Sequence, residues 1–154
     1  MKFNELAWGA VCFYYRSVGD SKYSRIMMDS EFLSRLRMSP AKVDATEFER
    51  KVILDYINIQ SYDLLVGQRL AGNILAKIVE LQPELSSLQD ISLLDCDLSD
   101  GNLLDKVTKA YMEFYSVQGL WLTGVSKIAH VLNDRLFPLI NLKISDHFKI
   151  LDAG

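Results

Sequence analysis

Cysteine, proline and long apolar runs are all scarce in this chain of 154 residues, which has two cysteines and three prolines. Cys12 and Cys96 lie far apart, each in an apolar stretch, which predicts two free thiols in a reducing compartment. No apolar run approaches the ~20 residues of a membrane-spanning helix. The start Met-Lys-Phe-Asn-Glu-Leu also lacks the apolar core of a signal peptide. We therefore expect a cytoplasmic protein that makes no membrane contact.

Basic charge is also in short supply, since the formal net charge is -3. Proteins that bind DNA without sequence preference usually carry a basic excess, because neutralising phosphates drives their affinity. The charge is uneven along the chain. Residues 22–42 carry five bases and two acids, whereas residues 83–105 carry six acids and no base. Arg35 and Arg37 should point outward from a helix, either as part of a phosphate-contacting patch or as a solvated face.

Strand signals are missing too, because apolar residues never alternate over several positions between turn-forming pairs. Apolar residues recur instead at helical spacing, and a chain of this length fits a single helical domain over residues 1–154. The fold prediction is an all-α, multi-helix bundle. Its expected helices are 3–18, one or two over 21–39, 45–58, 61–81 and 100–116, a short one that follows Thr123 and ends at Asn133, and a last one after Asn141.

Several residues predict how these helices begin or contact one another. Asp44 and Glu47 match a capping box, and Ser99 is expected to cap the helix over 100–116. On that helix we expect Leu104 and Tyr115 to face inward, together with Leu103, Val107, Tyr111 and Phe114. The helix over 61–81 contains Gly67 and Gly72, which predict either a close helix contact or a break near Gly67.

Metal and cofactor signals are weak. The acidic segment from Asp95 to Gly101 has the composition of a calcium loop, but its glycine comes one place late and Lys106 occupies the position of the bidentate glutamate. His130 and His147 are the only histidines and have no further zinc ligands at short spacing, so both are predicted to pack or to hydrogen-bond. We expect no metal and no cofactor.

The stretch from Gly119 to Phe148 has the most ordered set of signals in the chain. A glycine-bearing hairpin leads into a short helix that Thr123 is expected to cap, and Gly124 permits a close backbone approach. The helix should end at Asn133, and the free amides at its start predict an anion site.

These residues resemble the helix-hairpin-helix DNA glycosylase superfamily, whose hairpin reads Leu-Pro-Gly-Val-Gly-x-Lys-Thr-Ala. The stretch is closer still to uncharacterised bacterial relatives of that superfamily with a Thr-Gly-Ala-Ser-Lys, His-x-Leu-Asn, Leu-Phe, Trp-Asp pattern. The matching residues here are Thr123, Gly124, Ser126, Lys127, His130, Leu132, Asn133, Leu136 and Phe137. The resemblance covers about residues 119–148 and implies a helix-hairpin-helix, glycosylase-like bundle.

The resemblance also implies roles for particular residues. Gly119, Thr123, Gly124, Ser126 and Lys127 would bind nucleic acid through the hairpin. Ser126 replaces the second hairpin glycine, which weakens the phosphate-binding role. Lys127 corresponds to the lysine nucleophile of the bifunctional members, with a hairpin one residue shorter. Asn141 stands where the family has its catalytic aspartate, and a neutral amide cannot stabilise cationic charge comparably. Family members also continue with further helices beyond the position of Gly154.

Three functional hypotheses follow. The first is a non-catalytic, nucleic-acid-associated module that contacts duplex DNA through the hairpin. The second is a small acidic helical protein that binds or inhibits a protein partner, which the acids of residues 83–105 favour. The third is a DNA lyase that uses Lys127 to form a Schiff base.

Overall fold

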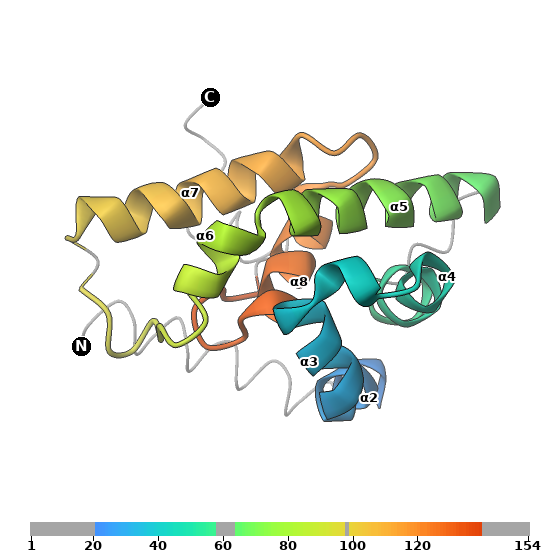
Figure 1. Cartoon of the computed structure of the whole chain (residues 1–154), viewed down its shortest axis with the longest axis horizontal. Coiled ribbons are helices and arrows are strands. Elements are labelled where there is room, and N and C mark those ends of the chain that lie inside the picture. The colour runs from blue at the N-terminus through green and yellow to red at the C-terminus, as the bar shows by residue number, and fades with distance from the viewer. Residues whose placement is uncertain (1–20, 58–63, 98, 140–154) are drawn as a thin grey trace.

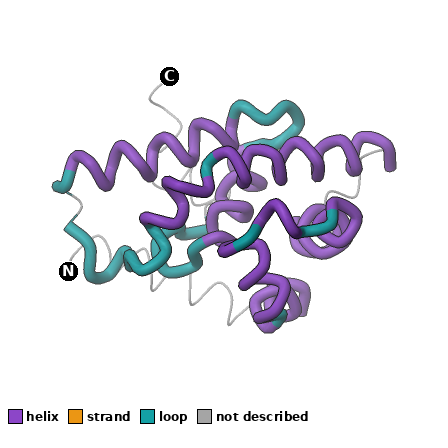
Figure 2. The backbone as a smooth tube through the Cα atoms, in the orientation of Figure 1, coloured by secondary structure: helices purple, strands orange, loops and turns teal. Residues whose placement is uncertain are grey.

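A computed structural model describes residues 21–57, 64–97 and 99–139, and the side chains of these residues except 21–24 and 64–68. This part of the chain is helical and contains no β-strand, which confirms the all-α prediction (Figure 2). The predicted helices over 3–18 and after Asn141, with Cys12, Asn141 and His147, lie outside the described residues. The elements are α2 (Ser21–Met28), α3 (Ser30–Met38), η1 (Pro40–Lys42), α4 (Ala45–Phe48), η2 (Glu49–Ile57), α5 (Leu64–Glu80), α6 (Gln82–Ser87), α7 (Gly101–Tyr115) and α8 (Leu122–Leu132).

Residues 21–39 form two helices because Asp29 interrupts the helical path. Its side chain accepts a hydrogen bond from the amide of Phe32 (3.1 Å) and so caps α3. Phe32, Leu33 and Leu36 form the buried face of α3. Asp29 therefore separates the two short helices, and its carboxylate is the acceptor that the Phe32 amide lacks within α3.

The capping box at Asp44 forms only in part. The Asp44 carboxylate accepts from the amides of Thr46 and Glu47, both at 3.0 Å, as predicted. The Glu47 carboxylate pairs instead with Arg35 and Lys51, both at 2.9 Å. The helix that begins here continues as nine residues of π-helix, η2, rather than as one α-helix to residue 58.

The break expected near Gly67 and a close helix contact at Gly72 are both wrong in α5. The helix runs unbroken from Leu64 to Glu80, through Gly67. A Cβ on Gly72 would meet no atom within 4 Å, so no helix approaches closely there. The inward face of α5 includes Ala71, Ile74 and Ile78, which are buried.

Asp100 rather than Ser99 caps α7. The Asp100 carboxylate accepts from the amide of Asn102 (3.0 Å), whereas the Ser99 hydroxyl donates to Asp97 (2.7 Å). The predicted cap was therefore one residue early, because either side chain satisfies the same local pattern.

The fold places α8 at the centre of the described helices. In Figure 1, α5 and α7 run side by side, and α8 lies beneath them among α3, α4 and α6. Helix α8 contacts α7, α3 and η2, and nearly every residue from Gly124 to Leu132 is buried. Burial on nearly all sides is what such a central position requires. None of the described helices is long and apolar enough to cross a membrane.

Candidate functional site

The hairpin predicted from the sequence is the loop over 116–121, between α7 and α8. Gly119 has φ 92°, the left-handed conformation that glycine adopts readily. Helix α8 then begins with Trp121 as its N-cap, without a side-chain cap. The prediction that Thr123 caps this helix is therefore wrong, since Thr123 is already the second residue of α8.

Two of the predicted nucleic-acid-binding residues are buried inside the molecule. A Cβ on Gly124 would lie 2.7 Å from Cδ1 of Leu120, so the close approach expected at this glycine is confirmed. The Ser126 side chain is fully buried, and its hydroxyl donates to the carbonyl of Thr123 (3.1 Å). Both residues are buried, so neither is exposed to the solvent at the hairpin.

Lys127 contacts the end of another helix. Its Nζ donates to the carbonyl oxygens of Tyr56 (3.0 Å) and Ile57 (3.5 Å) at the C-terminal end of η2. It also lies 5.3 Å from the centre of the Tyr56 ring. The last carbonyls of a helix lack partners within that helix, and a cation there is favourable. Lys127 therefore has a structural function that its sequence context does not reveal.

His130 is buried and hydrogen-bonded, as predicted. Its Nδ1 lies 2.7 Å from the carbonyl oxygen of Phe137, so this nitrogen carries the hydrogen. Burial lowers the pKa of His130, while the bond to Phe137 and the charge of Asp134 oppose the shift. This hydrogen bond connects the turn over 133–137 to α8.

Asn133 connects three segments. Its Nδ2 donates to the carbonyls of Leu88 (2.7 Å) and Ile91 (3.1 Å), and weakly to that of Gln89 (3.4 Å). Its Oδ1 accepts from the amides of Arg135 (3.0 Å) and Leu136 (3.1 Å). One buried amide side chain thereby satisfies backbone groups beyond the C-terminus of α6 and in the turn after α8.

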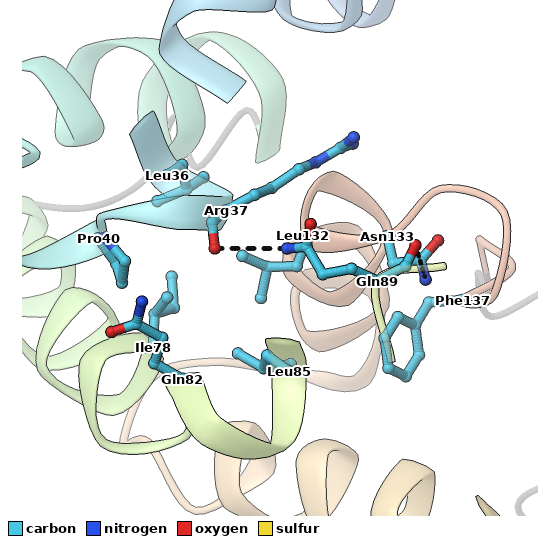
Figure 3. Close-up of a pocket in the computed structure, with 10 residues that line it drawn as sticks. All are labelled: Leu36, Arg37, Pro40, Ile78, Gln82, Leu85, Gln89, Leu132, Asn133 and Phe137. Atoms are coloured by element: carbon cyan, nitrogen blue, oxygen red, sulfur yellow. Dashed lines mark hydrogen bonds between the residues drawn. The ribbon is translucent and has the colours of Figure 1, made fainter. Parts of the chain in front are cut away.

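Side chains of α3, of the α6 segment and of the residue after α8 donate hydrogen bonds to backbone carbonyls near the ends of one another's helices. Gln82 and Gln89 of the α6 segment donate to the carbonyls of Met38 (3.1 Å) and Arg37 (3.3 Å), at the end of α3. Arg37 in turn donates to the carbonyl of Val131 (2.9 Å), near the end of α8. Asn133 completes the cycle, and we call this arrangement the C-terminal junction (Figure 3).

The C-terminal junction encloses little space. The cavity drawn in Figure 3 has a volume of about 10 Å³, close to the smallest space that holds a water molecule. A more open hollow of about 420 Å³ lies against α3, between Met27 and Asp134. The charged pair in that hollow, Arg37 and Asp134 at 3.0 Å, already has its partners within the protein.

Two of the five bases in the patch predicted over residues 22–42 are neutralised by acids. Arg35 pairs with Glu47 (2.9 Å), and Arg37 pairs with Asp134 and the Val131 carbonyl. Neither side chain points freely outward, so this expectation is wrong for both. Of the other bases in the patch, Arg25 and Lys42 are exposed, while the side chain of Lys22 is not among those described.

The outer face of α7 has the opposite character. Leu104, Met112 and Tyr115 are 53%, 62% and 55% exposed. Steps of three and four residues relate them through Thr108, so they form one stripe along the helix. The prediction that Leu104 and Tyr115 face inward is wrong, because Leu103, Ala110 and Phe114 occupy the buried face.

An apolar groove of about 200 Å³ runs beside this stripe. Leu104, Val107 and Tyr111 of α7 form one wall, and Leu136, Phe137 and Pro138 form the other. The Tyr111 ring packs edge-on against Phe137, with ring centres 5.5 Å apart. The buried Tyr111 hydroxyl has no hydrogen-bond partner among the described residues. The sequence of α7 could have predicted this exposed face, because its apolar residues fall on two stripes at helical spacing and not on one.

Metal binding finds no support in the described part of the chain, where no three His, Cys, Asp or Glu side chains come together. The Asp97 carboxylate accepts from the amide of Ser99 (2.9 Å), which gives the calcium-like segment a turn-forming role. Cys96 is a free, half-buried thiol. No protein-family model matches this chain, and neither does any of the curated proteins or solved structures with which it was compared.

Proposed function

We propose that this protein is a non-catalytic helical module that binds a protein partner through the outer face of α7. The observation that carries the proposal is the exposed stripe of Leu104, Met112 and Tyr115 beside an apolar groove. Methionine and tyrosine are enriched where proteins bind one another, and contiguous exposed apolar surface often marks such a site. In contrast, the resemblance to DNA glycosylases involves residues that are mostly engaged in contacts within this fold.

A neutral amphipathic peptide tests this proposal. We expect an 18-residue helical peptide, with leucine and phenylalanine on one face and glutamine on the other, to bind the full chain saturably in fluorescence anisotropy. The double variant Leu104→Gln with Met112→Gln should weaken this binding at least ~10-fold, which corresponds to ~1.4 kcal/mol. The matched control is Met28→Gln with Met38→Gln, two methionines that are 82% and 63% exposed. Absent binding, or equal loss in both variants, would contradict the proposal.

A second candidate function is nucleic-acid docking at the start of α8. The amides of Leu122 and Thr123, two half-buried residues, precede the first intrahelical hydrogen bond, which Val125 donates to Trp121. Trp121 is 75% exposed beside them. Open amides favour a phosphate, and an exposed indole can stack on a base.

Titrations with single-stranded and duplex DNA at two salt concentrations distinguish this candidate from the first. DNA docking predicts tighter binding at low salt and a loss of affinity in Trp121→Ala. No binding at low salt would exclude it, whereas the α7 stripe variants should leave it unchanged.

The third function, a lyase that uses Lys127, requires this side chain to leave the carbonyls of Tyr56 and Ile57. We expect borohydride treatment of the protein with an abasic duplex to trap no covalent adduct. A trapped adduct that disappears in Lys127→Arg would overturn the non-catalytic proposal.

A further inference from the structure

The groove along α7 has an acidic border at one end. Asp95, Asp97 and Asp100 lie in the segment that leads into α7, and all three are exposed. Residues 83–105 contain no base to neutralise them. Among the described residues, the base that pairs with this group is Arg135, 3.8 Å from Asp95, and both side chains are largely exposed. Three carboxylates against one guanidinium leave this border with a net negative charge.

We infer that this groove binds a basic amphipathic helix, whose apolar side chains fill the groove while its lysines or arginines face the acidic border. This inference rests on the proposed function and adds the chemistry of the partner. Charge complementarity across an interface selects partners and speeds their association. The acidic border makes an acidic partner unfavourable for the same reason.

The dimensions of the face fit a helix. Leu104 to Tyr115 spans eleven residues of α7, which corresponds to ~17 Å at 1.5 Å per residue. A partner helix of about three turns covers that length. The groove volume of about 200 Å³ is below the ~300–1,000 Å³ of typical small-molecule pockets, so an anchoring side chain suits it better than a cofactor.

A second copy of this chain is a poor occupant of the same face. If two α7 helices met in parallel, their acidic ends would lie together and repel. If they met antiparallel, each acidic end would face the other copy's C-terminal turn, where Tyr115, Ser116 and Gln118 provide no base. Neither orientation is complementary in charge, which favours a different, basic partner.

The acidic border can be changed without disturbing the helix. Asp97 and Asp100 accept local backbone hydrogen bonds through Oδ1, from Ser99 (2.9 Å) and Asn102 (3.0 Å). An asparagine keeps that oxygen and remains a good N-cap, so it removes only the charge. The triple variant Asp95→Asn, Asp97→Asn, Asp100→Asn is therefore a clean test of the field. A matched control removes three acids elsewhere, with Glu31→Gln, Asp55→Asn and Glu80→Gln.

The experiment compares three 18-residue peptides with the same leucine and phenylalanine face and a polar face of lysine, glutamine or glutamate. Anisotropy titrations against the full chain should show the lysine peptide binding at least ~10-fold tighter than the glutamine peptide, with the glutamate peptide weakest. This difference should shrink at higher salt. The triple asparagine variant should reduce the lysine peptide to the affinity of the glutamine peptide, while the control variant should not.

Each negative outcome of these titrations overturns a different part of the two proposals. If all three peptides bind equally and depend on Leu104 and Met112, the proposed function stands and the basic partner is wrong. If no peptide binds, both are overturned. Self-association that the Leu104 and Met112 variant abolishes would identify a second copy as the occupant and overturn the basic partner. If no peptide binds and that variant also lowers the unfolding midpoint, another part of this chain covers the face, which overturns both.

Discussion

The C-terminal junction and the outer face of α7 distribute their polar and apolar groups in opposite ways. In the junction, Asn133 is buried and Arg37 is half-buried, and their polar atoms bond to backbone groups of other helices. On α7, apolar side chains such as Leu104 and Met112 remain in water. Buried polar groups with partners are typical of structural sites, whereas exposed apolar stripes are typical of interfaces. Lys127, His130 and Asn133, which belong to the stretch that resembles a DNA-repair family, each hydrogen-bond to backbone carbonyls of other segments.

The largest expected effect concerns the amide at the centre of the junction. Asn133→Leu should lower the free energy of unfolding by about 3 kcal/mol, because the Ile91 carbonyl and the Arg135 amide lose their partners. The Leu88 carbonyl and the Leu136 amide each keep a single backbone hydrogen bond. Urea denaturation followed by circular dichroism measures this loss. The exposed Asn73→Leu is the matched control and should stay within about 0.5 kcal/mol. If both variants lose equally little, the junction does not hold the helices together.

A smaller loss of unfolding free energy is expected when Arg37, which donates to a carbonyl near the end of α8, is replaced. Arg37→Met removes the hydrogen bond to the Val131 carbonyl and the pair with Asp134, so we expect a loss of about 1–2 kcal/mol. Arg25→Met removes an exposed arginine from α2 and should have almost no effect. The same denaturation measurement applies. Equal stabilities of the two variants would contradict this prediction and would mean that Arg37 behaves as an ordinary solvent-exposed arginine.

On the α7 side, removing a polar atom should stabilise the protein. The Tyr111 hydroxyl is buried without a partner among the described residues, and burial raises its pKa strongly. Tyr111→Phe keeps the ring against Phe137 and should raise the unfolding free energy by about 1 kcal/mol. Tyr115→Phe, at an exposed position, is the control. A destabilised Tyr111→Phe would mean that the hydroxyl makes a bond within the free protein.

The smallest effect concerns pH. Burial lowers the pKa of His130 in the folded protein, whereas the unfolded chain binds a proton near pH ~6.5. The unfolded state therefore gains protons first as the pH falls, and stability should decrease from about pH 7 downward. Carboxylates whose pKa is lowered by paired lysines, Asp29 and Glu47, add their own loss at lower pH.

His130→Gln should flatten the change in unfolding free energy between about pH 7.5 and 5.5. His147→Gln, the substitution of the chain's second histidine, serves as the comparison. An unchanged slope in His130→Gln would show that this imidazole is not the group responsible.

Local features of the sequence were enough to locate most of the helices. Asp44 acts within a few residues of its own position, and the helix start that it predicts was found there. Where two neighbours had equivalent chemistry, such as Ser99 and Asp100, the sequence did not decide which one caps. The two apolar stripes of α7 were merged into one inward face for a related reason, since helical periodicity does not say which stripe is covered.

By itself, the sequence determined that this chain is helical and where most of its described helices begin and end, because caps, prolines and apolar spacing act over one or two turns. Only the tertiary structure decided what the polar residues between Ser126 and Asn133 do. Lys127 meets its carbonyls across 71 residues of sequence, Asn133 across 45, and the bond from Arg37 to Val131 spans 94. A side chain that satisfies the end of a distant helix leaves no local pattern, and so the same residues suggested a binding hairpin until the helices were seen in contact.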